Sequence, residues 1–433
     1  MSLSPRVEID EELYSYTPAD NGASPFWCFG NTCIVECKGR VFASGLETLP
    51  DLKPLNNCVP LLYTRDDQGW RLIYRGEGRT REPSPLCCFA DGRVFLSLNT
   101  SLVGPEEYGG PAKPSVLAFD ASSPDGPYSE ILPVWAGEPP FTEHSYRSFV
   151  ADSDRGELIV FQNIGNDHAE WAFMDAAGNW SANGQLNWLW GAEYDTQQPV
   201  RTCYPNVQLK NRAVYFCGVS DIIEPYNEWR AYRKELTGKD WDYDFRRLLF
   251  TWCDDVGEGS FHKWIEISSR DRTSGWIFPS DMLVDDDGMV HILWLERSLD
   301  ERLRERFFPL EKLTNSLNYA QIRNGVVRSR TALFVGGEDE APGKCDGARL
   351  HRTADGRILV VYSLDADATG ASPEMRIARI GPNGSLSQST TLSIEQPLSH
   401  YFTNTVRGGS PPSDTIHLLG GVENRVRYVR VDL

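Results

Sequence analysis

Basic, phenolic and imidazole side chains gather in short segments that precede apolar runs of the chain. The richest of these segments are TEHSYRSF (142–149), PVRTCYPN (199–206) and SHYFTNTVRGG (399–409). An arginine fork binds a carboxylate through two parallel hydrogen bonds, and histidine and tyrosine can transfer protons to and from a substrate. The segments therefore predict a site for an anionic small ligand or an acidic sugar.

Two further segments, NIGNDHAEW (163–171) and PYNEWRAY (225–232), carry the same residue types. In β-elimination beside a uronate carboxylate, an arginine neutralises the carboxylate, one histidine or tyrosine removes the neighbouring proton, and another protonates the leaving oxygen. The residues predicted for these catalytic roles are His144, His168, Tyr204, Tyr226, Arg201 and Arg230. The residues predicted to bind the substrate are Arg81, Arg147, Tyr146, Arg349, His351, Tyr401 and Arg407.

The same set allows a second chemistry, hydrolysis by an exo-acting glycoside hydrolase. In that reaction an arginine cluster holds the substrate, and a tyrosine paired with a carboxylate is the nucleophile. The cluster would consist of Arg81, Arg147, Arg201, Arg349 and Arg407. The nucleophile would be Tyr204 or Tyr401, and its partner Glu143 or Glu193. A third alternative, from another class, is a protein that binds a glycan or a protein partner without catalysis.

The elements that must position these residues repeat along the chain. A turn rich in Gly or Asp, followed by an apolar run, occurs seven times, from GRVFAS at Gly39 to SDTIHLLGG at Ser413. The repeats are spaced by about 62 residues, and each contains a second apolar run that most often leads into a tight polar turn. Four antiparallel strands at this period predict an all-β fold, the seven-bladed β-propeller.

We expect a single domain over residues 1–433. The blades are predicted at about residues 25–80, 81–140, 141–195, 196–270, 271–335, 340–395 and 396–433. The last repeat ends after its third strand, whereas residues 7–17 form a spare strand-like segment. We therefore expect the N-terminal strand to complete the last blade, which closes the ring and removes two exposed sheet edges.

Two segments, 218–244 and 295–313, break the strand pattern, and the second has the charge spacing of a short helix. Both follow the second strand of a blade, so both should lie on the face of the propeller where the innermost strands begin. Polar residues just before the innermost strands should point into the channel mouth on that same face. We expect the functional site there, because enlarged connections commonly carry function.

The charge balance restricts the partners. The 433 residues include 43 Lys and Arg against 61 Asp and Glu, which gives a net charge of −18. Such a charge opposes binding to a phosphate backbone or an anionic membrane surface. No segment approaches the roughly 18 consecutive apolar residues of a membrane helix. We expect a soluble protein whose partner is an acidic carbohydrate, with no nucleic acid and no membrane; the oligomeric state is left open.

Cysteine usage and the first residues bear on the compartment. The ten cysteines include no CxxC pair, and several lie inside apolar runs, which favours reduced thiols. The start, MSLSPRVEID, has no basic-then-apolar signal segment, so a cytoplasmic location is favoured. A secreted or periplasmic location stays open if a signal segment has been removed.

No cofactor is expected, and structural metals are the weaker alternative. Zinc could bind at Cys345 with His351, and calcium at the 285–288 turn or at Asp365 with Asp367. Both calcium candidates are interpreted first as hairpin turns.

With its seven repeats and the segments TEHSYRSF and NIGNDHAEW, the chain resembles the BNR-repeat, sialidase-like propeller superfamily. Within that superfamily it resembles polysaccharide lyases such as the ulvan lyases. The resemblance covers nearly the whole length and implies a seven-bladed propeller that acts by elimination at an acidic sugar. It implies catalytic roles by position for His144 and His168, for Tyr204 or Tyr226, and for Arg201 or Arg230. The sialidase turn Ser-x-Asp-x-Gly-x-x-Trp is present only in degenerate forms, such as TRDDQGW (64–70), which favours elimination over sialoside hydrolysis.

Overall fold

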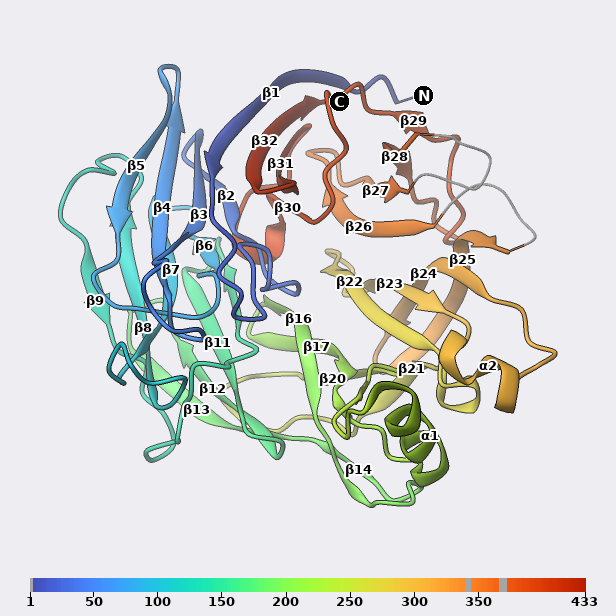
Figure 1. Cartoon of the computed structure of the whole chain (residues 1–433). Helices are drawn as coiled ribbons and strands as arrows, with labels where there is room; N and C mark the ends of the chain where they lie inside the picture. The colour runs from blue at the N-terminus through green and yellow to red at the C-terminus, as the bar shows by residue number, and fades with distance from the viewer. Residues whose placement is uncertain (1–2, 339–343, 366–371) are drawn as a thin grey trace.

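Apolar runs separated by polar turns fold into seven four-stranded antiparallel sheets, which are arranged as the blades of a β-propeller (Figure 1). The computed structural model describes residues 3–338, 344–365 and 372–433. The innermost strands of neighbouring blades contact one another around the axis. The predicted all-β, seven-bladed architecture is confirmed.

Each blade contains four strands, which are named in order from the axis outward. Blade one contains β2 (Ile34–Cys37), β3 (Arg40–Thr48), β4 (Cys58–Asp66) and β5 (Gly69–Arg75). Blade two contains β6 (Leu86–Cys88), β7 (Arg93–Ser101), β8 (Ala112–Asp120) and β9 (Ser129–Ile131). Blade three contains β10 (Ser148–Asp152), β11 (Glu157–Ile164), β12 (His168–Met174) and β13 (Trp180–Asn187).

The remaining blades follow the same order. Blade four contains β16 (Thr202–Lys210), β17 (Ala213–Ser220), β20 (Arg247–Cys253) and β21 (Ile265–Ser269). Blade five contains β22 (Trp276–Val284), β23 (Val290–Arg297), β24 (Thr314–Arg323) and β25 (Val326–Gly337). Blade six contains β26 (Cys345–Arg352), β27 (Ile358–Leu364), β28 (Glu374–Arg379) and β29 (Thr390–Thr391). Blade seven contains β30 (Tyr401–Thr403), β31 (Thr415–Val422), β32 (Arg425–Asp432) and β1 (Arg6–Ser15).

The ring is closed by the N-terminal strand, as predicted. β1 pairs antiparallel with β32 and forms the outermost strand of blade seven. Arg427 of β32 holds Asp10 of β1 at 2.6 Å. The Tyr14 hydroxyl accepts a hydrogen bond from the Leu46 amide of blade one at 3.0 Å. β1 therefore joins the last blade to the first.

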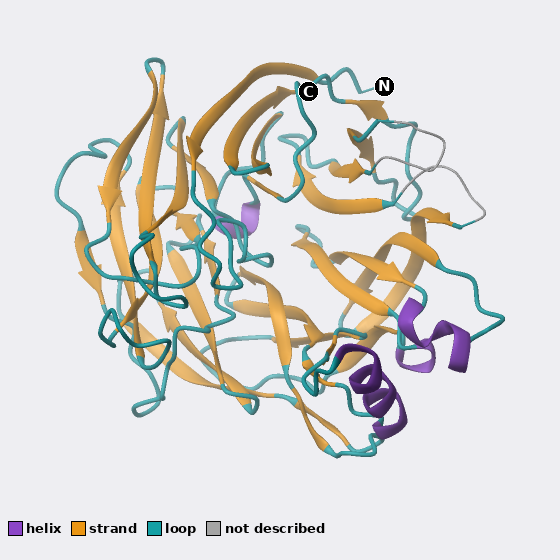
Figure 2. Cartoon of the chain, viewed as in Figure 1, coloured by secondary structure: helices purple, strands orange, loops and turns teal. Residues whose placement is uncertain are grey.

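Both irregular segments contain a helix, and both connect the second and third strands of their blades. In blade four the connection contains β18 (Ile222–Ile223), α1 (Asn227–Thr237) and β19 (Tyr243–Asp244). In blade five it contains α2 (Glu301–Phe307). The charge spacing predicted α2, but no signal in the sequence indicated α1. The two helices lie side by side (Figure 2), with the Trp229 and Phe308 rings 5.5 Å apart.

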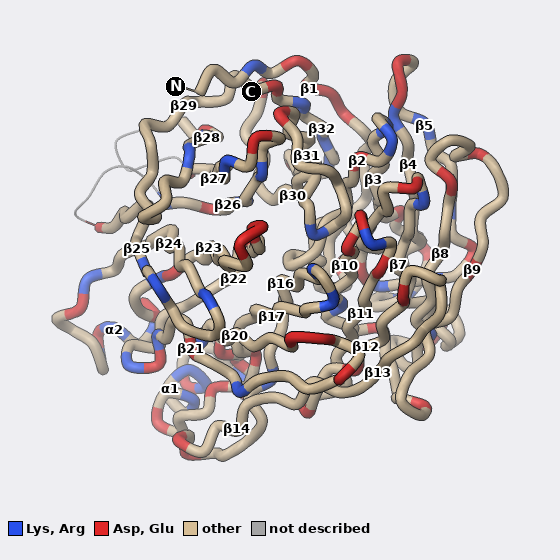
Figure 3. The backbone as a smooth tube through the Cα atoms, turned by 180° about the vertical axis from the view of Figure 1, so that it is seen from behind, with Lys and Arg blue, Asp and Glu red and all other residues tan. Residues whose placement is uncertain are grey.

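Other short elements lie between the blades. β14 (Leu189–Gly191) and β15 (Gln198–Val200) form a ladder between blades three and four, and η1 (Asp271–Thr273) and η2 (Val406–Gly408) are single 3-10 turns. None of the helices in the described part of the chain has the length and apolar character needed to span a bilayer. Acidic and basic residues are both distributed around the ring (Figure 3).

The inside of the channel is filled, which restricts any ligand to the channel ends. Arg407 of η2 is 1% exposed and pairs with Asp281 of blade five at 2.5 Å. It also donates to the backbone carbonyls of Gly30, at 2.8 Å, and Val207, at 3.2 Å. A Cβ atom at Gly30 would lie 1.8 Å from the Pro205 carbonyl oxygen, so only glycine lets the chain cross the channel at this point.

Candidate functional site

The loop between β1 and β2 carries aromatic side chains into the channel mouth. Phe29 of this loop makes ring contacts with Tyr204 at 5.5 Å, Phe278 at 5.0 Å and His400 at 5.8 Å. Sequence reasoning missed Phe29, although the segment PFWCFG (25–30) places three aromatic residues just before the first blade. Phe29 connects residues from blades four, five and seven at one point near the axis.

A row of aromatic rings crosses the channel mouth, and we call it the aromatic belt. It consists of His400, Phe29, Tyr204, Tyr146 and His144. Tyr204 and Tyr146 are 5.2 Å apart, and Tyr146 and His144 are 4.3 Å apart. The belt runs from the start of blade seven to the start of blade three. Such rings provide flat apolar surfaces with polar edges, a combination suited to sugar rings.

Both tyrosines of the belt have backbone conformations that bulky residues rarely adopt. The φ angle is 42° at Tyr146 and 51° at Tyr204. Left-handed backbone at a bulky residue costs about 1–3 kcal/mol and persists only where the surroundings enforce it, most often at functional sites. Burial raises the pKa of both phenols above the ordinary value, so both carry their protons at neutral pH.

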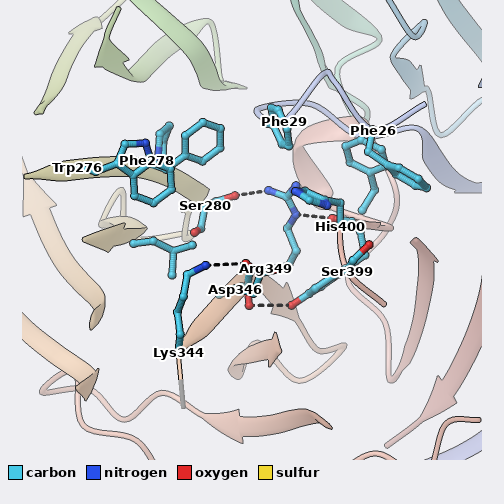
Figure 4. Close-up of a pocket in the computed structure, with 16 residues that line it drawn as sticks. Phe26, Phe29, Trp276, Phe278, Ser280, Lys344, Asp346, Arg349, Ser399 and His400 are labelled. Atoms are coloured by element: carbon cyan, nitrogen blue, oxygen red, sulfur yellow. Dashed lines mark hydrogen bonds and ion pairs between the residues drawn. The ribbon is translucent and has the colours of Figure 1, made fainter. Parts of the chain in front are cut away.

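At one end of the belt lies a cavity of about 190 Å³ between blades five, six and seven (Figure 4). We call it the aromatic cavity. Trp276 and Phe278 form its wall on the side of blade five, with stacked rings 5.4 Å apart and 10° from parallel. Its polar lining includes Lys344, which pairs with Asp346 at 3.3 Å, as well as Ser280, Arg349, Ser399 and His400. An apolar cavity with a few polar groups is typical of a small-molecule site.

At the other end of the belt lies His144. Its side chain is 32% exposed, and its Nε2 atom is 4.0 Å from a carboxylate oxygen of Glu82. The second oxygen of Glu82 accepts a hydrogen bond from the Ser145 hydroxyl at 2.5 Å. Burial, with the charges of Arg81 and Arg201, lowers the pKa of His144 to about 3, so the imidazole is neutral. Among the described residues, its Nε2 atom has no hydrogen-bond partner.

Arg201 is held in a fixed position beside this histidine. Its Nε donates to the Asp221 carbonyl at 2.8 Å, and one terminal nitrogen pairs with the Asp221 carboxylate at 3.0 Å. The guanidinium carbon lies 5.4 Å from the ring centres of both Tyr146 and Tyr243. Two aromatic rings and a buried acid therefore fix the guanidinium at the mouth.

The structure brings three of the six predicted catalytic residues together: His144, Tyr204 and Arg201, with Tyr146 between them. His168 lies instead at the start of β12, which is the third strand of blade three counted from the axis. It is on the same face as His144, and its Nε2 is 2.9 Å from Glu170. This carboxylate also accepts a hydrogen bond from Gln185.

The two candidates in the blade-four insertion lie at the start of α1 and within it, and not in the belt. Tyr226 precedes α1, and its ring contacts the Tyr194 ring at 5.5 Å. Burial is the main cause that raises the pKa of Tyr226 to about 12. Arg230 lies on α1 and pairs with Asp240 at 3.3 Å. Tyr226 therefore faces the loop between β14 and β15, and Arg230 faces its own insertion, which no strand pattern could have revealed.

Most of the predicted substrate-binding arginines bind backbone carbonyls. Arg147 donates to Ser97 and Pro83, both at 2.8 Å. Arg349 donates to Ser280 and, at 2.9 Å, to Tyr401. Arg349 thereby ties the innermost strand of blade six to those of blades five and seven, and Arg147 ties the start of blade three to blade two. Arg349 nevertheless lines the aromatic cavity. Arg81 lies beside His144, and its Nε donates to the Asn21 carbonyl at 3.1 Å.

Tyr401 of blade seven and His351 of blade six lie at opposite ends of the channel. The Tyr401 hydroxyl donates to the Val361 carbonyl at 2.9 Å, and its ring lines the aromatic cavity. His351 is near the far end of β26, where its Nε2 is 2.7 Å from the Ser413 carbonyl. Burial lowers the pKa of His351 to about 4. The structure therefore separates His351 from the channel mouth.

The acids considered for the hydrolase alternative are engaged elsewhere. Glu143 accepts a hydrogen bond from the Gly110 amide at 2.9 Å, and Glu193 pairs with Arg247. The Tyr401 hydroxyl, in turn, bonds to backbone as described above. Within the described part of the chain, the tyrosine–carboxylate pair of that mechanism is therefore not assembled from these residues.

The residues considered for metals have other partners. Cys345 contacts the Gly347 carbonyl at 3.7 Å, at the opposite end of β26 from His351. The Asp285 carboxylate caps its own turn through the amides of Asp287 and Met289. Asp367 lies outside the described residues. Within the described ranges, no three His, Cys, Asp or Glu side chains form a group suited to a metal ion. All ten cysteines are free thiols.

Comparison with known proteins gives structural likeness at low identity. No protein-family model and no curated protein matches the sequence. A Penicillium chrysogenum α-L-arabinanase in complex with arabinobiose is 11% identical, with 98% of each chain covered and a TM-score of 0.49. A puromycin-hydrolysing peptidase of Mycobacterium tuberculosis is 11% identical, with 97% of this chain and 54% of that chain covered and a TM-score of 0.48.

The sialidase of Trypanosoma rangeli, in complex with the inhibitor DANA, is 11% identical, with 81% of this chain and 54% of that chain covered and a TM-score of 0.39. The seven four-stranded blades confirm the propeller fold that the sequence predicted. These matches assign no activity to the chain, because proteins of one fold differ in function. An acidic substrate and elimination chemistry stay predictions.

Proposed function

We propose that this propeller binds an acidic carbohydrate along the aromatic belt and cleaves it by β-elimination. One observation carries the proposal: Tyr146, held in a strained backbone conformation, lies between a neutral histidine, His144, and a fixed arginine, Arg201. Strain of this kind is retained where it positions a side chain for function. The three groups are those that elimination beside a carboxylate requires.

In the proposed reaction Arg81 and Arg201 pair with the uronate carboxylate, which acidifies the neighbouring C–H bond. His144 removes that proton, and the electron pair forms the new carbon–carbon double bond. The bond from the sugar to its leaving oxygen breaks, and Tyr146 or Tyr204 gives that oxygen a proton. The products are an unsaturated uronate and a chain with a new free end.

The pKa of His144 makes the reaction dependent on an acidic substrate. An imidazole with a pKa of about 3 is a weak base, and the charges of Arg81 and Arg201 contribute to that low value. A carboxylate that pairs with these guanidinium groups offsets their charge, so the pKa of His144 rises when the substrate binds. A neutral sugar would leave His144 a weak base.

The test is incubation with a panel of uronate polymers while the ultraviolet absorbance of the unsaturated product is followed. We expect absorbance with at least one polymer, and a loss of about 100-fold or more in rate for His144→Ala and Tyr146→Phe. His262→Ala is the matched control, because His262 lies on an outer turn of blade four, paired with Asp254. Circular dichroism establishes that each variant is folded.

The alternatives give different results in the same assay. New reducing ends without absorbance would indicate hydrolysis, and binding without either signal would indicate a non-catalytic glycan-binding propeller. Elimination at the unchanged rate in both His144→Ala and Tyr146→Phe would overturn the assignment of the site.

A further inference from the structure

A second, larger cavity of about 430 Å³ adjoins the aromatic cavity. We call it the helical cavity, because the insertions that contain α1 and α2 form much of its wall. It is lined by Arg233, Arg246, Arg297, Leu299, Asp300 and Arg302, and on its other sides by Tyr243, Phe245 and Asn315. Trp276 and Lys344 line both cavities, so the two cavities are neighbours.

The floor of the helical cavity is rigid. Glu224 is fully buried and accepts ion pairs from Arg233 at 2.8 Å and Arg246 at 3.0 Å. Arg233 also pairs at 2.8 Å with Asp300, whose carboxylate caps the start of α2 by accepting from the Arg302 amide. This network joins both insertions to blade four, so the cavity exists before any ligand binds.

The rim of the helical cavity combines polar donors with exposed aromatic surface. Arg297, Asn315 and Lys344 are partly or fully exposed, and their nitrogen atoms can donate to hydroxyl or carboxylate oxygens. Tyr243 is 43% exposed and lies against Arg201, which contacts the belt. Phe245 contacts Tyr204 of the belt at 6.0 Å. The rim is therefore continuous with the belt.

The cavity sizes bear on the length of the ligand. The aromatic cavity, at about 190 Å³, is below the range of about 300–1,000 Å³ that holds a whole drug-sized ligand, whereas the helical cavity is within it. A single sugar ring would leave the helical cavity unused. Trp276 stacks on Phe278 and borders both spaces, so it can contact two successive rings of one chain.

We infer that the substrate is a linear acidic oligosaccharide or polymer, and that the helical cavity binds the sugar unit next to the one in the aromatic cavity. The inference rests on the proposed function and adds the length of the substrate to it. It assigns the rim residues Arg297, Asn315 and Lys344 to the second unit.

The experiment is calorimetric titration of the His144→Ala protein, so that the ligand is not consumed. The probes are galacturonate, glucuronate and guluronate oligomers of one to four units. We expect affinity for at least one series to rise by about tenfold or more between one and three units. Arg297→Ala and Asn315→Ala are then both added to the His144→Ala protein, which gives the double variant. In it the rise in affinity from one to three units should be about tenfold smaller, while affinity for the single unit stays unchanged.

Arg328→Ala is the matched control, because Arg328 is an exposed residue of β25 outside both cavities. It should leave every affinity unchanged. Equal affinity for all lengths, or equal weakening of the single unit and the trimer in the double variant, would overturn the inference and leave the proposed function standing. An absence of binding at every length in all three series would overturn both. Thermal unfolding of each variant shows that the measured protein is folded.

Discussion

At the scale of single residues, the neutral state of His144 has a consequence for stability. Its pKa is about 3 in the folded protein and about 6.5 in an unfolded chain. Between these values the unfolded chain binds a proton that the folded protein does not. The free energy of unfolding should therefore fall as the pH is lowered from about 6.5 toward 3. The neutral His144 contributes its full stabilisation of the folded protein only above about pH 6.5.

We predict that His144→Gln makes this fall shallower. The measurement is urea unfolding of both proteins at several pH values between about 7 and 4. His351, whose pKa is also low, contributes equally to both proteins and cancels in the comparison. Identical slopes for the parent and His144→Gln would contradict the assigned pKa.

Residue types alone indicated which side chains could bind an anion, but not which of them were available. Arg147, Arg349 and Arg407 were predicted to bind substrate, and their guanidinium groups are largely occupied by backbone carbonyls. A buried arginine near the axis can serve either purpose, since both carbonyls and carboxylates accept its hydrogen bonds. Only the tertiary contacts distinguish the two cases.

At the scale of elements, Glu224 connects the two helical insertions to the propeller. Its removal leaves Arg233 and Arg246 buried without their shared acid, and breaking a buried pair costs about 3–5 kcal/mol. We predict that Glu224→Ala loosens residues 218–244 and 298–313 while blades one to three stay protected. Hydrogen exchange measures this directly. Asp240→Ala, which removes an exposed pair with Lys234, should change little. Uniform loss of protection over the whole ring would contradict the prediction.

The elements that the sequence indicated were those with a regular pattern. Alternation and turn residues are local signals, so β strands and the charge-patterned α2 were predictable. Helix α1 and the loop that carries Phe29 have no such signal. The loop is held by Gly30 packing on Pro205 and by ring contacts with three blades, all distant in sequence. His168, Tyr226 and Arg230 of the predicted catalytic set lie outside the belt, because the direction of a side chain depends on tertiary contacts of this kind.

At the scale of the whole molecule, the period of about 62 residues was sufficient to predict the ring. A four-stranded blade cannot bury both of its faces alone, so each packs on its neighbours and the number of repeats fixes the architecture. The sequence also indicated the closure by β1, since an unpaired strand remained at one end and a missing strand at the other. It did not indicate that side chains fill the channel along the axis. That filling depends on one arginine of blade seven, which contacts a loop and two other blades.

That arginine, Arg407, connects the loop at Gly30, blade four at Val207 and blade five at Asp281. We predict that Arg407→Met lowers the free energy of unfolding by about 3–5 kcal/mol, because it leaves the buried Asp281 carboxylate without its cation. Adding Asp281→Asn should recover part of the loss, since the amide oxygen can still accept hydrogen bonds such as that from the Leu350 amide. The measurement is urea unfolding followed by tryptophan fluorescence. Arg323→Met, at an exposed turn of blade five, is the control and should unfold like the parent. A double variant no more stable than Arg407→Met alone would show that the ion pair does not hold the axis together.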